Sequence, residues 1–383
     1  MTPDAAEAYG RRLMDALWIE TTDALAAWTE GIGGCALALD TEADSFHHYR
    51  EKVCLVQLSA GDRHALIDPL GSIDLAPLKV PLAEGTIRKI LHGADYDIRL
   101  LSRDFDLSVF GLVDTMIAAR LLGEPALGLA ALLEAHLGVT LDKTQQRADW
   151  SRRPLSQAMR AYAVEDTRHL EALASILERR LEELGRTAWV REEWERLECV
   201  RWRDRRDTEP EPFRRTKGAR ALDRAGLAVL RELWQWRDAF ARKRDKPLFR
   251  VLRDETLLAM AKSPPSSIGD LTRIPGFPDY LVRSPSANDV LDAARRGASC
   301  PEADRPETRV EVRERLQPAV EARIDLIRQR RDELARTLEL DPSVLASRGV
   351  IEEMAKRWEA GDDPWETAEL RRWQTGLLRP ALA

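Results

Sequence analysis

Short apolar runs alternate with helical repeats over the first third of the chain. Four runs bounded by Gly, Asp or Pro have the length and composition of β-strands. They are Cys35–Leu39, Val53–Leu58, His64–Ile67 and Lys89–His92. Apolar residues at helical spacing predict helices at Ile98–Ser102, Thr115–Leu122 and Leu127–Leu137, the last closed by Gly138. This alternation indicates an α/β layered domain.

The pattern becomes helical from Leu155 onward. Ser156 is a candidate N-cap for a helix running through Leu184. A Pro-containing stretch at 201–218 is expected to be a linker. Further helical patterns follow at Leu222–Lys243, Leu252–Ala261, Ile268–Leu271 and from Val310 to the C-terminus. We therefore expect a first domain over residues 1–200 and helical domains over 219–292 and 308–383.

Composition and charge are those of a folded protein that does not enter a membrane. A hydrophobic fraction of 44% and a charged fraction of 32% favour globular domains. No apolar stretch is long enough to span a bilayer, and the first residues lack a signal-peptide pattern. The four scattered cysteines favour reduced thiols and a cytoplasmic location.

Basic residues are concentrated after the first domain. Residues 201–253 carry 17 basic and 8 acidic side chains, in a chain whose net charge is −6. Such a run is most often a solvated helix face. Beside an acidic first half, it can also attract a polyanion.

Acidic residues in three separate segments are the main candidates for chemistry. Asp40 and Glu42 are two apart at the end of an apolar strand, so their side chains share a face. Asp97 follows the last predicted strand, and Tyr162 and Asp166 are four apart on a helix. Taken singly, each has an ordinary explanation, such as a helix cap or an exposed helix face. If they converge, the carboxylates form a hard-oxygen site for Mg²⁺ or Mn²⁺.

Two divalent ions in such a site would activate a water and stabilise the leaving oxygen of a phosphodiester. Tyr162 could orient that water or help to take its proton. The three segments therefore indicate a metal-dependent site for cutting phosphodiester bonds.

In order and spacing, these segments resemble the ribonuclease D group of DEDD 3′–5′ exonucleases. The first motif is matched by Asp40-Thr41-Glu42, the second by His92 to Asp97, and the third, Tyr-x-x-x-Asp, by Tyr162 to Asp166. A sister subclass has a histidine five residues before the last aspartate, where this chain has Ala161. The resemblance covers roughly residues 19–185 and includes the loop from Asp142 to Leu155.

The resemblance implies an α/β fold of the ribonuclease H-like kind, with a mixed central sheet flanked by helices, followed by all-α HRDC-type modules. Phe213–Arg283 resembles an HRDC domain, a small helical module that binds nucleic acid. Residues 310–383 are similar to a second, more divergent copy. The resemblance to ribonuclease D further implies two Mg²⁺ or Mn²⁺ ions held by Asp40, Glu42, Asp97 and Asp166. It also implies Tyr162 and Glu42 as catalytic residues.

Candidate substrate contacts also follow from the resemblance. Phe46 and Tyr49, in the loop after Glu42, can stack on a base or pack locally. Lys143, Gln146 and Arg147 can contact the scissile end or remain in a solvated loop. Thr41 and His92, within the first two motifs, complete the candidates.

The expected function is a 3′–5′ exoribonuclease that releases nucleoside 5′-monophosphates from RNA with a 3′ tail, with tRNA precursors as the typical substrate of the family. No protein partner is implied. A DNA 3′–5′ exonuclease is one alternative, because the sequence does not show a preference for the 2′-OH. A non-catalytic RNA-binding protein is the other, although none of the five motif positions is lost.

Overall fold

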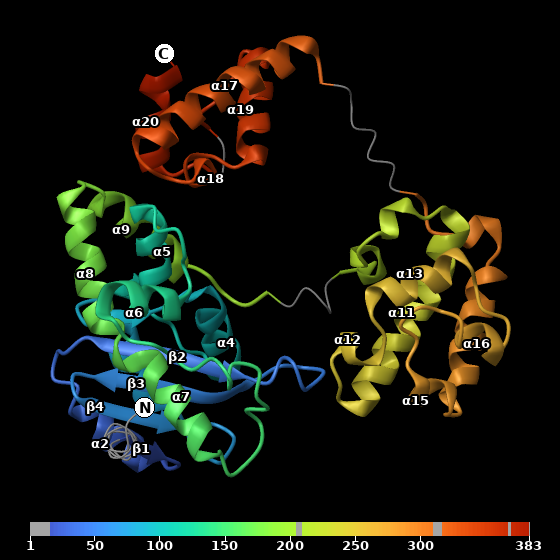
Figure 1. Ribbon diagram of the computed structural model, residues 1–383, viewed down its shortest axis with the longest axis horizontal. Coiled ribbons are helices and arrows are strands. Elements are labelled where there is room, and N and C mark those ends of the chain that lie inside the picture. The colour runs from blue at the N-terminus through green and yellow to red at the C-terminus, as the bar shows by residue number, and fades with distance from the viewer. Residues whose placement is uncertain (1–15, 204–208, 309–315, 367–368, 383) are drawn as a thin grey trace. The chain divides into compact units, whose positions relative to one another are not determined.

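The computed structural model describes residues 16–203, 209–308, 316–366 and 369–382. Contacts divide these residues into two units, whose elements are labelled in Figure 1. The first unit comprises residues 16–43, 53–202, 316–366 and 369–382, and the second comprises 44–52, 203 and 209–308. Within these ranges, no helix combines the length and apolar character needed to cross a bilayer.

A mixed six-stranded sheet forms the centre of the first unit, in the order β1-β4-β3-β2-β5-β6. Its strands are β1 (Ala16–Ile19), β2 (Leu37–Ala43), β3 (Val53–Ala60), β4 (Arg63–Ile67), β5 (Lys89–Leu91) and β6 (Leu112–Asp114). β3 runs antiparallel to β2 and β4, whereas β1, β5 and β6 join by parallel pairing. All four predicted strands are present. β1 and β6 are additional, and β6 is too short to give a recognisable apolar run.

Helices cover both faces of this sheet (Figure 1). The helices of this part are α2 (Thr22–Glu30), η1 (Ala76–Leu78), α3 (Lys79–Ala83), α4 (Asp95–Phe105), α5 (Thr115–Leu122), α6 (Leu129–Leu137), α7 (Gln157–Arg168), α8 (Leu170–Glu183) and α9 (Thr187–Glu198). The main core packs α4, α5 and α8 against the face that carries Val56 and Leu58 of β3. A smaller core packs α7 against Leu55 on the opposite face.

The helix predicted from Leu155 to Leu184 is two helices, α7 and α8, interrupted at His169. Ser156 caps α7 as predicted, accepting a hydrogen bond from the N–H of Met159 at 3.2 Å. Near the interruption, the hydroxyl of Thr167 bonds both the hydroxyl of Ser59 and the carbonyl of Val164. Such side-chain bonds to the preceding turn compete with the helical ladder and bend it.

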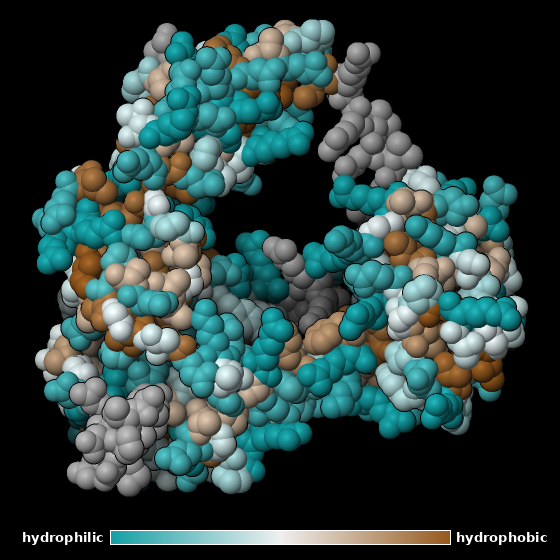
Figure 2. Space-filling model, in the orientation of Figure 1, coloured by the Kyte–Doolittle hydropathy of each residue, from teal (hydrophilic) through white to brown (hydrophobic). Residues whose placement is uncertain are grey.

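The second unit is a helical bundle around α11. Its elements are η2 (Pro212–Arg215), η3 (Ala219–Ala221), α11 (Arg224–Arg244), α12 (Leu248–Val251), α13 (Asp254–Lys262), α14 (Ile268–Leu271), α15 (Asp279–Val282), α16 (Ser286–Ala298) and η4 (Glu302–Asp304). Leu230, Leu233 and Val290 are fully buried in its core. Hydrophilic residues predominate on the face of the molecule shown in Figure 2.

The last helices pack against the exonuclease-like part of the first unit. They are α17 (Pro318–Thr337), α18 (Pro342–Leu345), α19 (Arg348–Ala360) and α20 (Arg372–Leu382). The rings of Trp189 on α9 and Trp373 on α20 stack with centroids 5.0 Å apart. Arg371 pairs with Glu193 at 3.0 Å. The segment predicted as a separate C-terminal domain therefore shares a packed interface with the first one.

Candidate active site

Strand β2 changes from buried apolar residues to half-buried polar ones at Asp40. Leu37–Leu39 are buried, and Asp40 and Glu42 follow on one face of the strand. The antiparallel register places Gln57 opposite Asp40 and Leu55 opposite Glu42. Because Leu55 packs against α7, the two carboxylates face the same helix.

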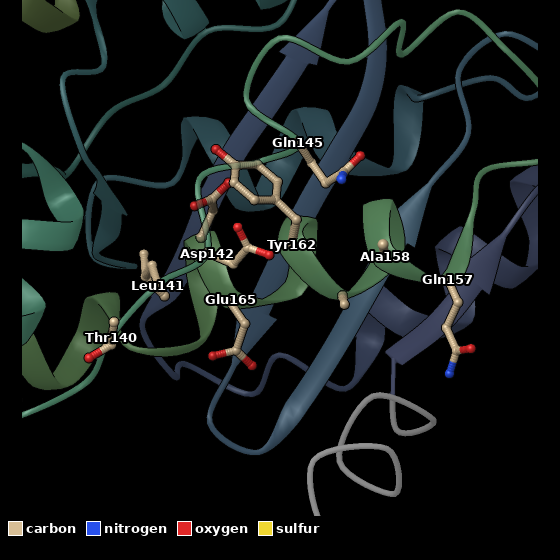
Figure 3. Close-up of a pocket in the computed structure, with 10 residues that line it drawn as sticks. Thr140, Leu141, Asp142, Gln145, Gln157, Ala158, Tyr162 and Glu165 are labelled. Carbon is tan, nitrogen blue, oxygen red and sulfur yellow. The ribbon is translucent and has the colours of Figure 1, made fainter. Parts of the chain in front are cut away.

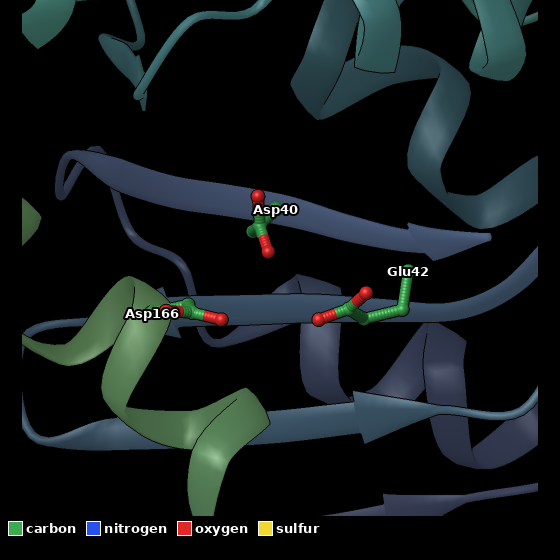
Figure 4. Close-up of side chains that lie close together, drawn as sticks. All are labelled: Asp40, Glu42 and Asp166. Carbon is green, nitrogen blue, oxygen red and sulfur yellow. The ribbon is translucent and has the colours of Figure 1, made fainter. Parts of the chain in front are cut away.

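Helix α7 carries Tyr162 and Asp166 one turn apart, and Asp166 meets the carboxylates of β2. One oxygen each from Asp40, Glu42 and Asp166 lie within 4.8 Å of one another. Figure 4 shows the three side chains directed into the space between strand and helix. The structure thus brings together residues from the first and third motifs, which are more than a hundred positions apart in sequence.

Asp97 lies beside this cluster, in the first turn of α4. One of its carboxylate oxygens accepts a hydrogen bond from the hydroxyl of Thr41 at 2.5 Å. Its charge helps to raise the pKa of both Asp40 and Glu42. Asp97 is not one of the three residues whose oxygens lie within 4.8 Å of one another, so it borders the cluster rather than completing it.

Burial, as the largest cause, raises the pKa of all four carboxyl groups. The pKa of Glu42 rises to about 9, that of Asp166 to about 7 and that of Asp97 to about 6. The pKa of Asp40 lies well above its usual range, through burial and through repulsion from the three other carboxylates. No cationic side chain among the described residues offsets these shifts. The donor set therefore fits a hard divalent cation such as Mg²⁺ or Mn²⁺, which would neutralise it.

Tyr162 keeps its proton and lies beside Asp166. Burial, followed by the charges of Asp166, Glu42 and Asp40, raises the pKa of the phenol. Hydrogen bonding between the phenol and Asp166 adds to the rise in the pKa of Tyr162 and partly lowers that of Asp166. Trp150 packs beside the ring, with the two ring centroids 6.0 Å apart. The hydroxyl is thereby held at the edge of the carboxylate cluster.

A pocket of about 330 Å³ opens next to Tyr162 and Asp166. Its walls are one face of α7 and the loop that precedes that helix, from which Asp142 and Gln145 contribute side chains (Figure 3). Among the described residues, no lysine or arginine lines it. The pocket therefore offers hydrogen-bond acceptors and amides, which suit hydroxyl and base groups better than a phosphate.

The loop residues predicted to contact substrate do not line this pocket. Lys143, Gln146 and Arg147 are exposed in the same loop. The two other candidates within the motifs are already hydrogen-bonded. Thr41 donates its hydroxyl to Asp97, and Nδ1 of His92 lies 2.9 Å from the hydroxyl of Thr115. Burial, as the largest cause, lowers the pKa of His92, and its contact with substrate stays a prediction.

Phe46 and Tyr49 belong to the second unit by their contacts. Tyr49 is buried, and its hydroxyl donates to Asp238 at 2.6 Å while Arg242 lies over its ring. Of the two alternatives for Tyr49, base stacking and local packing, the structure shows local packing. Phe46 is 45% exposed and meets Phe249 edge to face. Base stacking by Phe46 stays a prediction.

Comparison with known proteins identifies the family. A 3′–5′ exonuclease family model matches residues 16–182, and an HRDC domain model matches residues 226–293. Ribonuclease D of Escherichia coli is 31% identical over 373 residues, covering 95% of this chain and 96% of that protein. The chain belongs to the ribonuclease D family. It is a 3′–5′ exoribonuclease, as the resemblance of its motifs implied.

Further relatives agree with this assignment over most of their length. Ribonuclease D of Pseudomonas paraeruginosa is 31% identical, with 90% of each chain covered. The crystal structure of the Escherichia coli enzyme, described as an exoribonuclease involved in structured RNA processing, superimposes with a TM-score of 0.70 at 30% identity, covering 96% of this chain and 97% of that one. A Bifidobacterium adolescentis protein shares the fold, with a TM-score of 0.79 at 23% identity over 96% of each chain. The acidic cluster is thus the metal-binding cluster of a DEDD exonuclease.

Sequence reasoning passed over two residues of the ribonuclease D loop that the structure places in the pocket. Asp142 and Gln145 line it beside Tyr162, whereas the residues predicted from this loop were Lys143, Gln146 and Arg147. The functional role that the sequence predicts for this loop stays a prediction. Only its fold shows which side chains turn inward.

Proposed function

We propose that this chain hydrolyses RNA one nucleotide at a time from the 3′ end, releases nucleoside 5′-monophosphates and uses two divalent ions. The observation that carries the proposal is the meeting of Asp40, Glu42 and Asp166 within 4.8 Å, beside the hydroxyl of Tyr162. Burying ionised carboxylates without cationic partners lowers the stability of the fold. A bound divalent ion offsets that loss.

Each residue of the cluster has a distinct role in this proposal. Asp40, Glu42 and Asp166, with Asp97 at the border, would hold the ions. When bound, the ions lower the pKa of a water and stabilise charge on the leaving oxygen. Tyr162 keeps its proton and orients the attacking water through its hydroxyl. Glu42 would act both as an ion ligand and as a catalytic residue, because its carboxylate lies within the cluster beside Asp166.

The substrate is proposed to be RNA with a 3′ tail, such as a tRNA precursor, in the cytoplasm. The pocket beside Tyr162 would take the sugar and base at the scissile end, because its lining offers acceptors and amides and no cation. Lys143, Gln146 and Arg147, exposed on the rim loop, are retained as candidate contacts to phosphate.

The helical modules are proposed to hold RNA near the catalytic cluster. The proposed domains are residues 1–200 for the exonuclease, 201–218 for the linker and 219–292 for the HRDC domain. Residues 308–383 are proposed as a divergent HRDC-like module. Tethering by such modules raises the local concentration of substrate without altering the chemistry.

One experiment tests polarity, product and metal requirement together. RNA labelled at the 5′ end and, separately, at the 3′ end is incubated with the enzyme, with and without EDTA. We expect 5′-labelled RNA to shorten in single steps and 3′-labelled RNA to release labelled mononucleotide at once, both only without EDTA. A matched DNA oligomer should be cut more slowly. Undiminished cleavage in EDTA would reject the metal-dependent mechanism.

A further inference from the structure

Gln57, on the central strand β3, is an unusual residue beside the catalytic cluster. It is fully buried, and neither its amide nitrogen nor its amide oxygen has a hydrogen-bond partner among the described residues. Buried polar groups are nearly always paired, so an amide with both ends unpaired needs an explanation. Its position supplies one, because the strand register places it directly opposite the metal ligand Asp40.

The two nearest side chains on the same face of β3 as Gln57 have packing or hydrogen-bond partners. Two residues before it, Leu55 packs in the apolar core under α7. Two residues after it, Ser59 exchanges hydrogen bonds with Thr167 of α7 and with His64. Only Gln57 has unmet hydrogen-bonding capacity in this row of three side chains. The unpaired amide is therefore specific to the position facing Asp40.

Asp40, in turn, has little to hold its carboxylate in place. Only the backbone of Thr41 lowers its pKa, whereas burial and the three like-charged carboxylates around it raise that pKa. Directly opposed residues of an antiparallel pair have Cβ atoms about 4.5–5.5 Å apart, within reach of a glutamine amide and an aspartate carboxylate. Carboxylates that bind metals are usually held by a second layer of hydrogen bonds, which fixes the direction of their lone pairs.

We propose that Gln57 is a positioning residue for the divalent-ion site, and that its amide N–H donates to Asp40 when the ions are bound. The proposal rests on the proposed function, because it assigns Asp40 as a metal ligand. A carboxylate that holds a cation is a strong acceptor, and the amide of Gln57 directly opposite Asp40 can donate a charge-assisted hydrogen bond to it. The same bond aims the other oxygen of Asp40 at the ion.

Calorimetric titration of the full chain with Mn²⁺ tests this role. Gln57→Met keeps the volume and removes both amide groups. We expect it to weaken Mn²⁺ binding about 10- to 100-fold and to lower kcat while leaving KM for RNA unchanged. Without ions, its unfolding midpoint should equal or exceed that of the native chain, because an unpaired buried amide is gone. A purely structural role predicts the reverse, a lower midpoint and native Mn²⁺ affinity, and that result would overturn the proposal.

Two controls separate this proposal from the proposed function. Ser59→Ala disturbs the same row of side chains away from Asp40, and should lower the unfolding midpoint while retaining native Mn²⁺ affinity. If the native chain itself binds no Mn²⁺, the proposed function fails and not merely the role of Gln57. Should Gln57→Met not fold, crystals of the native chain with Mn²⁺ decide the matter. The amide nitrogen of Gln57 within about 3.2 Å of a carboxylate oxygen of Asp40 supports the proposal, and a larger separation overturns it.

Discussion

The carboxyl group of Glu42 is largely buried beside Asp166 and Asp97, and with no cation nearby its pKa rises to about 9. Between pH 4.5 and 9 the folded chain therefore binds a proton at this position that the unfolded chain has lost. The contribution of Glu42 to the free energy of unfolding falls as pH rises through this window. A bound divalent ion reverses this pH dependence, because it binds the ionised carboxylate of Glu42.

Glu42→Gln should accordingly stabilise the chain in the absence of divalent ions. We expect the free energy of unfolding to rise by about 1–3 kcal/mol at pH 8 and to change little at pH 5, where native Glu42 is protonated. Urea unfolding in EDTA at both pH values measures this. Glu183→Gln, at an exposed position on α8, serves as the control and should show no pH-dependent difference. Equal effects of Glu42→Gln at both pH values would contradict the assignment.

Tyr162→Phe tests the role of the phenol hydroxyl. The ring still packs against Trp150, so the fold and the Mn²⁺ affinity should remain close to native. Loss of the group that orients the water should lower kcat about 100-fold, with KM for RNA unchanged. Single-turnover cleavage of a labelled oligomer gives this rate. A rise in KM at native kcat would instead make Tyr162 a substrate contact.

The motif residues could be predicted from sequence because their spacing and their strand or helix context are local properties. The shared strand face of Asp40 and Glu42, and the helical turn between Tyr162 and Asp166, follow from periodicity alone. The end of the strand does not, because β2 continues to Ala43. Which groups have partners could not be predicted. The bond from Thr41 to Asp97 spans 56 positions, and the unpaired amide of Gln57 depends on the register between two strands.

At the scale of elements, the loop between α6 and α7 is fixed at its end by Arg153. Its guanidinium bonds both carboxylate oxygens of Asp68, at 2.5 and 2.6 Å, and the carbonyl of Cys54 at 2.6 Å. Asp68 is buried, so the pair ties the loop to the sheet where it leads into the catalytic helix. This anchor supports the pocket wall that carries Asp142 and Gln145.

Removing that anchor should destabilise the first unit. Arg153→Met leaves the buried carboxylate of Asp68 without its cation, and we expect a loss of about 2–4 kcal/mol in the free energy of unfolding. The neighbouring Arg152→Met is a matched control, because Arg152 is 81% exposed and pairs only with Asp149, so its loss should cost less than about 0.5 kcal/mol. Urea unfolding followed by tryptophan fluorescence compares the two. Similar losses of unfolding free energy in the two variants would contradict the anchoring role of Arg153.

Element prediction succeeded where apolar periodicity was strong and failed where tertiary contacts decide. The four predicted strands lie in the sheet, whereas β6 has three residues and owes its place to pairing with β5. We attribute the interruption between α7 and α8 to the hydrogen bonds of Thr167 with Ser59 of β3 and with Val164 of its own helix. The pattern of apolar residues along the chain does not reveal such bonds.

At the scale of the whole chain, the candidate catalytic residues and the basic residues proposed to bind RNA are divided between the two units. The carboxylate cluster and its pocket lie in the first unit, whereas the basic residues at the end of α11 lie in the second. The basic excess after residue 200 was visible in sequence. The packing of Trp373 against Trp189 was not visible in sequence, because the two residues are far apart along the chain.

Charge reversal at and just after the C-terminal end of α11 tests the binding role proposed for the second unit. Lys243→Glu with Lys246→Glu changes two exposed side chains and leaves the catalytic cluster untouched. We expect KM for a long RNA to rise about tenfold at low ionic strength, with kcat unchanged and the difference shrinking as salt is added. Lys356→Glu, an exposed site in the first unit, should leave KM near native. An unchanged KM in the double variant would exclude this surface from RNA binding.

The central claim is that carboxylates of β2 and α7 jointly hold divalent ions, and anomalous diffraction from crystals grown with Mn²⁺ tests it most directly. The account predicts two anomalous peaks, one of them within about 2.3 Å of oxygens from Asp40, Glu42 or Asp166, and loss of both peaks in Asp40→Asn. Crystals with ordered Mn²⁺ elsewhere and none at these carboxylates would contradict it.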